Sequence, residues 1–545
     1  MQGLMQNKQL LISTLIEHAG LNHPEVQIVS RTCEGTIHRT NYATLRKRAK
    51  QLAKALLALG IESGDRVGTL AWNTYRHQEL YFAVPGMGAV LHTINPRLFA
   101  DQIEYIIQHA EDTVLFFDIT FSTLLEPLLP KLKHVRAFIA LCDIDQLPQN
   151  IPNCLSYEQL LREQNDEFEW PEFAETQAAS LCYTSGTTGN PKGVLYSHRS
   201  TLLHAFTVCT VDGLQLSRKD CVLLAVPMFH VNAWGFPYAA AMCGAKVCFP
   251  AAQIDAASLC ELAAQEQCTM SIGVPTVWLS VMDYLEHHPE KTKQLNINRI
   301  VMGGSATPRA LIDRIQNNLN ATTIQAWGMT ETSPMGTIGN LLPEHMALEQ
   351  SERFDIQSKQ GRAIYGVEIR VIDDHGQVLA RDGVSAGHLQ VRGPWIVSAY
   401  FKADEQNILD AHGWFSTGDI ACISAEGYLQ ITDRSKDVIK SGGEWISSID
   451  LENTAVAHPA IQEAAVIGLN HSKWQERPLL VAIKRPDMQI DEQELIHFLS
   501  KRVAKWWLPD DVVFVQSLPH TATGKLQKNV LREQFKDFVF SSDRS

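Results

Sequence analysis

Residues 183–193 read Tyr-Thr-Ser-Gly-Thr-Thr-Gly-Asn-Pro-Lys-Gly and gather glycines, hydroxyl side chains and one lysine. Glycine lets a backbone approach a ligand closely, hydroxyls hydrogen-bond to it, and successive backbone N–H groups in such a turn bind anions. Lys192 adds a positive charge that suits a polyphosphate. The segment therefore predicts a phosphate-binding loop, whose candidate residues are Thr184, Ser185, Gly186, Thr187, Thr188, Gly189 and Lys192.

The lysine of this loop is followed by Gly193, whereas a Walker A lysine is followed at once by Ser or Thr. An ordinary P-loop NTPase is therefore not expected. An exposed Gly/Ser/Thr connector is the simpler alternative. The strand-like residues 179–183 run straight into the loop, and this favours a ligand site at the end of a strand.

Residues 326–332 place an aromatic ring, a hydroxyl and a carboxylate close together in the sequence. Trp327 can stack on a purine, Thr330 can bind a phosphate, and Glu331 can hold Mg²⁺, which prefers carboxylate and phosphate oxygens. The alternative for this segment alone is a core tryptophan followed by residues that cap a helix.

Three other segments carry weaker signals. Residues 303–305, Gly-Gly-Ser, follow apolar residues 300–302, as expected of a strand that ends where a ligand meets the main chain. Asp419 can accept both hydroxyls of a ribose, although an Asp after Gly is more often a plain turn residue. Lys525 follows a glycine near the C-terminus, and a single lysine there is usually a solvated charge.

The bulk composition, with 45% hydrophobic and 20% charged residues, is that of a globular protein, and 545 residues require more than one domain. The net charge of −13 argues against nucleic acid or an anionic membrane surface as the main partner. The 11 scattered cysteines lack zinc-ligand spacing and indicate a reducing, cytoplasmic location. We infer no secretion signal.

The uncharged stretch 221–245 is long enough to span a membrane. It contains Pro227, Pro237, His230 and Asn232, which would be costly in lipid, so we expect a buried, ligand-facing segment instead.

Alternating amphipathic and apolar segments predict parallel α/β packing in the first part of the chain. We expect helices over 42–59, 76–87 and 100–110, and strands over 66–72, 89–93 and 114–118. Past about residue 360, strands at 368–373, 388–392, 419–424 and 428–433 predict a small β-rich subdomain. The last part predicts an α+β module, with helices over 448–457 and 492–507 and strands over 464–469, 479–484 and 511–515.

Together these segments resemble the adenylate-forming superfamily of acyl-CoA synthetases, luciferases and peptide-synthetase adenylation domains. The motifs stand in the family's order over nearly the whole chain, at 183–193, 226–234, 326–332, 416–419 with 433–443, and 519–525. Segments 93–98, 226–235 and 440–447 are more narrowly similar to bacterial medium- and long-chain fatty acyl-CoA synthetases. Related enzymes with this signature act on short thioether acids.

The resemblance implies a fold of layered α/β sheets over residues 1–432 with the β-rich subdomain, a hinge at 433–437, and a mobile α+β domain over 438–545. It implies that a carboxylate attacks the α-phosphate of ATP to give acyl-AMP, and that the CoA thiol then displaces AMP. Mg²⁺ is the implied cofactor, with ATP and CoA as co-substrates and a fatty acid as substrate. A homodimer and peripheral membrane contact are left open.

The family's roles map onto residues of this chain. Thr184 and Glu331 would hold Mg²⁺, and Lys525, with His230, would act on the reacting groups. Further nucleotide-binding positions implied by the resemblance are Gly303, Gly304, Ser305, Gln325, Ala326, Trp327, Gly328, Met329, Thr330, Asp419 and Arg434. Lys436 would be the hinge, and with Lys440 and Trp445 would touch the adenylate in one state.

Val231 and Trp234 match a gate between the nucleotide site and an acyl tunnel, although Trp234 can also be read as a core residue. His520 stands where the family usually has Arg, and Trp327 where many members have Tyr. Two alternatives to a fatty acyl-CoA synthetase remain: a ligase for another acid (aryl or short thioether) or for a carrier thiol, and a non-catalytic regulator that binds acyl-adenylate.

Overall fold

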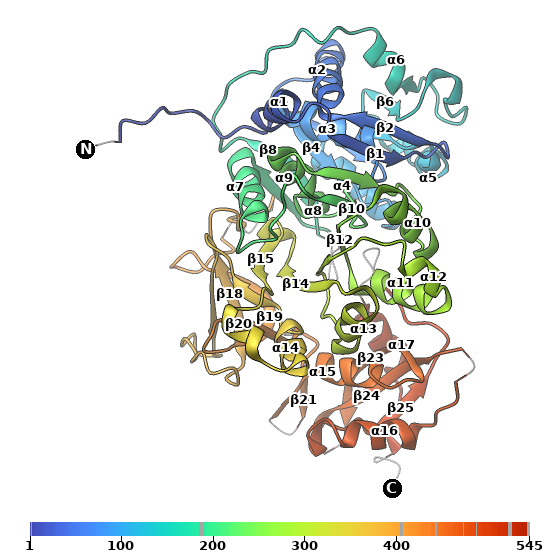
Figure 1. Ribbon diagram of the computed structural model, residues 1–545, viewed down its shortest axis with the longest axis vertical. Helices are drawn as coiled ribbons and strands as arrows, with labels where there is room; N and C mark the ends of the chain where they lie inside the picture. The colour runs from blue at the N-terminus through green and yellow to red at the C-terminus, as the bar shows by residue number, and fades with distance from the viewer. Residues whose placement is uncertain are drawn as a thin grey trace.

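The computed structural model describes residues 1, 3–184, 190–403, 407–434, 436–441, 444–471, 473–486, 488–520 and 526–541, with the backbone alone at 444 and 445. The chain passes from α/β layers in its N-terminal part to a smaller α+β part at the C-terminal end, at the bottom of Figure 1. This is the fold class that the sequence predicts.

The first sheet is parallel except at one edge, where β8 and β9 are antiparallel. Its order is β7 (Leu155–Ser156), β6 (Ala137–Ala140), β5 (Asp112–Phe117), β3 (Arg66–Leu70), β4 (Val90–Thr93), β8 (Ala178–Tyr183) and β9 (Gly193–Ser197). Because Tyr183 pairs with Gly193, the two ends of the 183–193 segment are held side by side.

The second sheet is larger and changes character along its length. Its order is β17 (Glu368–Ile372), β18 (Gly387–Arg392), β19 (Phe415–Ile423), β20 (Tyr428–Arg434), β16 (Gly361–Ala363), β15 (Met335–Ile338), β14 (Thr322–Gly328), β13 (Arg299–Met302), β12 (Met270–Gly273), β10 (Cys221–Leu224), β11 (Lys246–Phe249), β1 (Gln27–Arg31) and β2 (Ile37–Asn41). It is parallel from β14 to β1 and antiparallel from β14 to β17. The β-rich region past residue 360 is therefore present, but its strands extend a continuous sheet.

The third sheet belongs to the C-terminal part. Its order is β22 (Glu444–Ile446), β21 (Ile439–Ser441), β24 (Gln475–Lys484) and β23 (Ile461–His471), and β25 (Asp511–Phe514) pairs with β24. The division at 433–437 stays a prediction.

The helices cover these sheets (Figure 1). They are α1 (Ile12–Asn22), α2 (Tyr42–Ala58), α3 (Tyr75–Gly86), α4 (Ala100–Ala110), α5 (Ser122–Leu125), α6 (Tyr157–Arg162), α7 (His198–Cys209), α8 (Val231–Trp234), α9 (Phe236–Cys243), α10 (Ala256–Glu266), α11 (Pro275–His287), α12 (Pro289–Thr292), α13 (Arg309–Leu319), α14 (Gln350–Gln357), α15 (Ser448–Val456), α16 (Glu492–Ser500) and α17 (Lys528–Gln534). Short 3-10 helices lie at Ile119–Phe121, Glu126–Lys131, Ile144–Gln146, Thr330–Thr332, Pro343–Ala347 and Lys505–Trp507.

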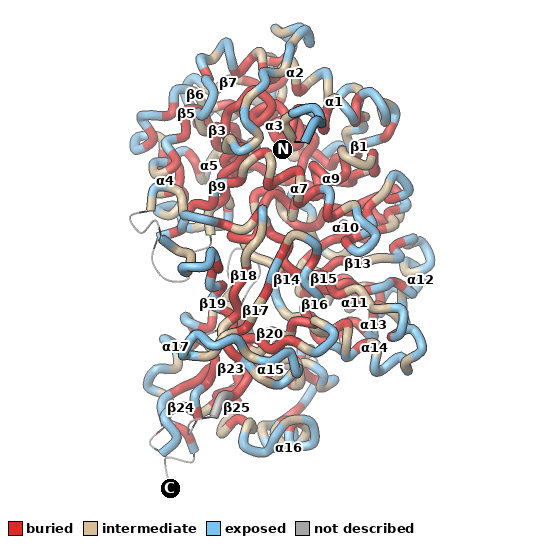
Figure 2. Tube along the Cα trace, turned by 90° about the vertical axis from the view of Figure 1, so that its left-hand side faces the viewer, coloured by how far each residue is buried: buried red, intermediate tan, exposed pale blue. Residues whose placement is uncertain are grey.

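Helix α3 is buried on every side, because α1, α2 and strands of both large sheets pack around it. In Figure 2 buried segments fill the interior, whereas the outer faces of α12 and α16 are exposed. Within α3, the buried carboxylate of Glu79 accepts hydrogen bonds from Arg48 Nε at 2.6 Å and from the Tyr157 hydroxyl. Buried charges require such partners.

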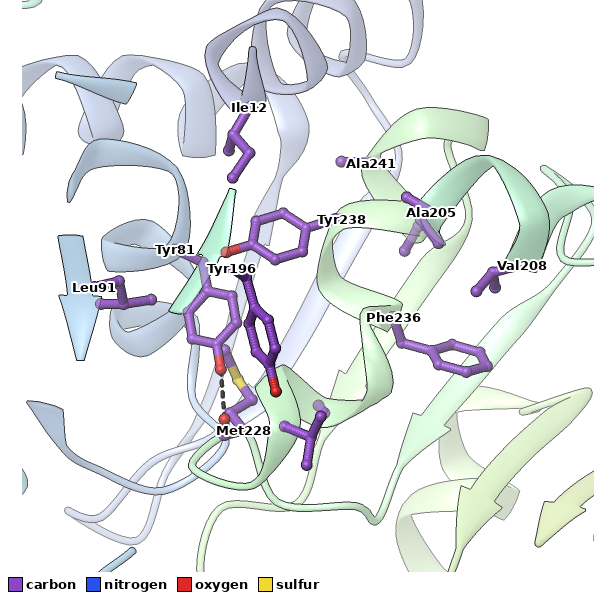
Figure 3. Close-up of a cluster of buried hydrophobic side chains, with 14 of the residues drawn as sticks. Ile12, Tyr81, Leu91, Tyr196, Ala205, Val208, Met228, Phe236, Tyr238 and Ala241 are labelled. Atoms are coloured by element: carbon purple, nitrogen blue, oxygen red, sulfur yellow. Dashed lines mark hydrogen bonds between the residues drawn. The ribbon is translucent and has the colours of Figure 1, made fainter. Parts of the chain in front are cut away.

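The segment that follows β10 is anchored to α3 and to Asn73, which lies two residues before α3 begins. Asn73 donates to the carbonyls of Leu224 and Val226 at 2.9 and 2.8 Å and accepts from the Met228 amide at 2.6 Å. The Tyr81 hydroxyl donates to the Met228 carbonyl (Figure 3). These bonds fix the backbone just before His230, so the core of the protein determines where this segment points.

Most of the expected elements are confirmed, with ends that shift by a few residues. Helix α2 begins at Tyr42 because the Asn41 side chain accepts from the Thr44 amide and caps it. The helix expected over 492–507 is too long, since α16 ends at Ser500. The uncharged stretch 221–245 forms β10, α8 and α9 and is largely buried, as expected. Over the described residues, no helix has the length and apolar character that a membrane span needs.

Candidate active site

A cavity of about 830 Å³ opens where the carboxyl ends of β12, β13 and β14 meet β8 and the C-terminal part. Parallel sheets usually bind ligands at this edge. Polar residues line it, including Thr184, Lys192, Glu331 and Arg434, and so do apolar residues such as Phe236. The cavity can therefore hold a molecule with a charged part and an apolar part.

The predicted phosphate-binding residues lie at the β8–β9 hairpin. The Thr184 amide donates to the Lys192 carbonyl at 2.9 Å, and the Thr184 hydroxyl accepts from the Lys192 amide at 3.2 Å. These bonds close the neck of the hairpin and bring Thr184 and Lys192 to the cavity. The predicted loop residues between them, 185–189, lie outside the described part of the chain.

Glu331 is a buried carboxylate of the cavity, with 7% of its surface exposed. Its Oε1 accepts from the Tyr400 hydroxyl at 2.8 Å. Burial raises the pKa of Tyr400, so the hydroxyl stays protonated and donates. The Lys192 ammonium lies 4.8 Å from the centre of the same ring. Tyr400 thus links the predicted phosphate residue to the predicted metal ligand.

These oxygen atoms suit Mg²⁺. The ion is usually held by one or two carboxylates together with substrate phosphates. Glu331 is a buried carboxylate, and it lines the same cavity as Thr184, which carries a hydroxyl, so the donor set fits.

Trp327 and Asp419 form one hydrogen-bonded unit. The Trp327 indole Nε1 donates to Asp419 Oδ2 at 3.1 Å, and Arg434 Nε lies 2.8 Å from Asp419 Oδ1. The tryptophan ring packs against Gly336, where a Cβ would lie 2.5 Å from Cζ3. The ring is therefore held rigidly at the wall of the cavity, and Asp419 orients both Trp327 and Arg434, which line it.

The segment Val231–Trp234 is a left-handed turn. All of its residues have φ between 47° and 56°, although none is glycine. This conformation costs roughly 1–2 kcal/mol per residue. The Asn232 side chain holds it, since Nδ2 donates to Ser180 Oγ at 2.8 Å and Oδ1 accepts from Tyr81 and Cys182 at 3.4 Å. The turn directs Trp234 toward Gly303.

Gly303 provides the space that Trp234 needs. A Cβ at this position would lie 3.2 Å from Trp234 Cη2 and 2.8 Å from the Ala326 carbonyl oxygen. We expect Gly303→Ala to lower kcat/KM for the acid by at least about tenfold, because a displacement of about 1 Å can cost more than that. The double variant with Trp234→Ala tests the cause: part of the Gly303→Ala loss should disappear once the ring is gone. Full additivity would show that Trp234 is not the group displaced.

The segment between the two parts of the chain also reaches the cavity, through Asp433, Arg434, Lys436 and Asp437. Asp433 Oδ2 accepts from the Ser448 amide at 2.8 Å, and Arg532 Nη2 lies 2.7 Å from Asp437. Burial lowers the pKa of Lys436. These bonds hold the C-terminal part against the large sheet in this arrangement.

The C-terminal residues at the cavity flank the segment 521–525, which lies outside the described residues and contains Lys525. His520 and Leu526 form an antiparallel bridge, and Leu526 lines the cavity. His520 Nε2 lies 2.6 Å from Glu463 Oε1, and Nδ1 lies 2.9 Å from the Leu518 carbonyl. Two acceptors suit the doubly protonated ring.

The hydrogen bond to Glu463 raises the pKa of His520. Its contribution to stability is present below pH about 6.5 and is lost as pH rises through the raised pKa. We therefore expect His520→Gln to lower Tm near pH 6 but to have little effect near pH 9, as measured by thermal melts across this range. Glu463→Gln should give the same pH-dependent loss, and the double variant no more. A loss that is equal at all pH values would show that the charged pair is not responsible.

The structure brings most of the predicted site residues to one cavity. Those that line it are Thr184, Lys192, His230, Val231, Trp234, Gly303, Gly304, Ser305, Ala326, Trp327, Gly328, Met329, Thr330, Glu331, Arg434 and Lys436. Gln325 faces away and accepts from the Thr307 amide at 3.2 Å. Lys440 is exposed on β21, and Asp419 lies behind Trp327. Lys525 and the Trp445 side chain lie outside the described residues.

Sequence reasoning missed the residues that support the site. Tyr400 and Glu463 belong to no glycine-rich or charged motif, so no local signal could have found them. Asn73 follows a strand, where a polar side chain is a weak pointer to a ligand or to a buried backbone. Tyr196, whose hydroxyl donates to the Thr330 carbonyl at 2.6 Å, lies on β9 just after the predicted loop.

The fold and the cavity define an enzyme of the adenylate-forming superfamily. The chain belongs to the AMP-binding enzyme family, whose model matches residues 16–401, and a model described as AMP-binding enzyme C-terminal domain matches residues 450–525.

Two relatives match along nearly their whole length. The chain is 47% identical over 540 residues to a 3-methylmercaptopropionyl-CoA ligase of Ruegeria lacuscaerulensis, covering 98% of this chain and 99% of the relative. It is 45% identical over 546 residues to a medium-chain-fatty-acid–CoA ligase of Ectopseudomonas oleovorans, covering 100% of both. Among solved structures, an anthranilate CoA ligase in complex with anthranoyl-AMP has the same fold, with a TM-score of 0.84, 24% identity, and coverage of 95% of this chain and 96% of that one.

Proposed function

We propose that this protein activates a medium- or long-chain fatty acid as its CoA thioester, by way of an acyl-adenylate, with release of AMP and pyrophosphate. The observation that supports this most directly is one cavity that Glu331, Lys192 and Trp234 line together with apolar side chains. Acyl-CoA ligase names on the relatives, one of them for medium-chain fatty acids, point the same way.

The apolar residues that line the cavity suit a hydrocarbon chain. Phe236, Leu214 and Leu279 line it together with Val301 and Met335. Each methylene buried there would contribute about 0.8 kcal/mol. Binding should therefore strengthen with chain length until the pocket is full.

The polar residues would bind the nucleotide and stabilise negative charge in the reaction. Thr184, Lys192 and Glu331 would hold the phosphates and Mg²⁺, which neutralises charge on phosphate oxygens when bound. Arg434, oriented by Asp419, would contact the ribose. Lys525 would lie between the carboxylate and the α-phosphate, where negative charge develops. No protein nucleophile is needed.

We also propose a cytoplasmic location. All 11 cysteines are free thiols in the structure, as expected in a reducing compartment.

A short thioether acid is the alternative with a specific observation behind it, because a relative at 47% identity is named for 3-methylmercaptopropionate. An aryl acid, a carrier thiol as acceptor, and a regulator without turnover are the remaining alternatives.

A substrate panel decides among these. The purified protein would be assayed for ATP–pyrophosphate exchange and for CoA-dependent AMP release with straight-chain acids from C4 to C16, 3-methylmercaptopropionate and benzoates. We expect kcat/KM to rise along the straight-chain series to a maximum at a medium or long chain. A maximum at the thioether acid or at benzoate would assign the alternative acid. Exchange without CoA-dependent AMP release would point to another acceptor, and the absence of exchange with every acid would favour the regulator.

A further inference from the structure

Three buried cysteines meet on one face of neighbouring strands of the second sheet, away from the cavity. Cys221 begins β10, Cys248 lies on the adjacent β11, and Cys268 lies just before β12 on the other side of β10. Cys221 pairs with Lys246, and Leu223 pairs with Cys248, so both cysteines project from the same face of the sheet. Helices α10 and α11 cover this face.

The sulfur atoms are close enough to share one ligand. Cys221 Sγ lies 3.6 Å from Cys248 Sγ and 3.7 Å from Cys268 Sγ, and all three atoms lie within 4.8 Å of one another. The point equidistant from them is therefore about 2.1 to 2.4 Å from each sulfur, which spans the metal–thiolate bond length of about 2.3 Å. Elsewhere in the described residues, no other group of at least three His, Cys, Asp or Glu side chains converges in this way.

A charged side chain lies near the group, because the Lys246 ammonium donates to the Glu266 carbonyl at 3.5 Å. Lys246 and Arg39 also donate to the Glu266 carboxylate, at 2.8 and 3.0 Å. The Glu266 carbonyl also lies 3.4 Å from Cys221 Sγ. Cys248 and Cys268 are 0% exposed and Cys221 7%, so water has little access.

We propose that Cys221, Cys248 and Cys268 form a binding site for a soft d10 cation in a trigonal thiolate arrangement, with Cu(I) as the expected occupant. Thiolate ligands select Cu(I) and Zn²⁺. Structural zinc is almost always four-coordinate, and this group offers three side-chain ligands.

Such a cation would tie β11, β10 and β12 together. None of the three cysteines lines the candidate active site, which opens at the carboxyl end of β12. The site would therefore add stability without touching a substrate, and it is independent of the acid that the enzyme uses.

Cu(I) titration of the reduced protein under anaerobic conditions, in competition with a chromogenic Cu(I) chelator, tests the proposal. We expect a single tightly held Cu(I) per chain, sulfur-to-copper absorption in the ultraviolet, three sulfur neighbours by X-ray absorption and a raised Tm. Cys221→Ser and Cys268→Ser should weaken binding at least about 100-fold, since even changes to groups behind the ligands cost 10- to 100-fold.

Cys260→Ser is the matched control, because Cys260 is buried beneath the same face but is not part of the group. Cys248→Val keeps an apolar side chain in a buried position. If this variant has native circular dichroism and has lost Cu(I) binding, the loss does not come from unfolding. Binding by wild type that is no tighter than by Cys221→Ser, or equal loss in Cys260→Ser, would overturn the proposal. Tight binding of Zn²⁺ with none of Cu(I) would overturn the trigonal assignment.

Discussion

Lys525→Ala is expected to slow formation of the acyl-adenylate by about 10²- to 10³-fold, the usual loss when a donor to a developing negative charge is removed. Thioester formation from supplied acyl-AMP and CoA should stay within a few-fold of wild type, because AMP is already a leaving group in that step. Rapid-quench single-turnover assays of each half-reaction measure the two rates separately.

The control for this variant is Lys501→Ala, which removes an exposed lysine just after α16. It should leave both half-reactions unchanged. Equal losses in the two half-reactions of Lys525→Ala would contradict a role confined to adenylation. They would also argue against the predicted hinge at Lys436, because a rotation there that withdrew Lys525 before CoA reacts would leave the second half-reaction untouched.

Glu331→Gln is expected to lower the adenylation rate by about 100-fold and to raise the Mg²⁺ concentration needed for half-maximal rate. The amide keeps the shape of the side chain but removes the charge that would hold the ion. Initial rates across a Mg²⁺ titration at fixed ATP measure both effects.

Tyr400→Phe separates the charge of Glu331 from its support. This variant removes one hydrogen bond to the carboxylate and leaves the carboxylate in place, so a loss of only about tenfold is expected. A Glu331→Gln enzyme with an unchanged Mg²⁺ requirement would exclude Glu331 as a metal ligand. Equal losses in the two variants would show that the position Tyr400 gives to the Glu331 carboxylate matters more than the charge of that carboxylate.

Local pattern predicted the elements well where periodicity and end signals agreed. The helix at Tyr42 has both an apolar stripe and an Asn41 cap. The prediction of a helix as far as residue 507 was wrong, because the later residues of that range carry signals that terminate a helix. Pro509 disfavours helical geometry at Leu508, and residues 505–507 form a separate 3-10 turn.

Sheet continuity was not predictable, because it depends on pairing between distant segments. Strand β16 pairs with β15 and β20, which come from different parts of the chain, and each looks like an ordinary short strand. The sequence predicted a small β-rich subdomain past about residue 360, and its strands are present. The structure adds that β14 joins them directly to the parallel strands below the cavity.

Motifs predicted the chemistry-bearing residues but not the groups that orient them. Glu331 and Asp419 stand in recognisable segments, whereas Tyr400 and Trp327 become their partners only through the fold. The left-handed turn could not be anticipated, because Val231 and Ala233 are residue types that avoid positive φ.

The turn at Val231–Trp234 has a further consequence for how the protein can change over evolution. Its strained shape is maintained by Asn73, Tyr81 and Ser180, which all lie outside the cavity. Mutations in α3 or β8 can therefore reset the position of Trp234 without altering any cavity residue. With the predicted role of Trp234 as a gate to the acyl site, acid preference would depend partly on the core, and proteins with the same cavity residues could differ in the acids they accept.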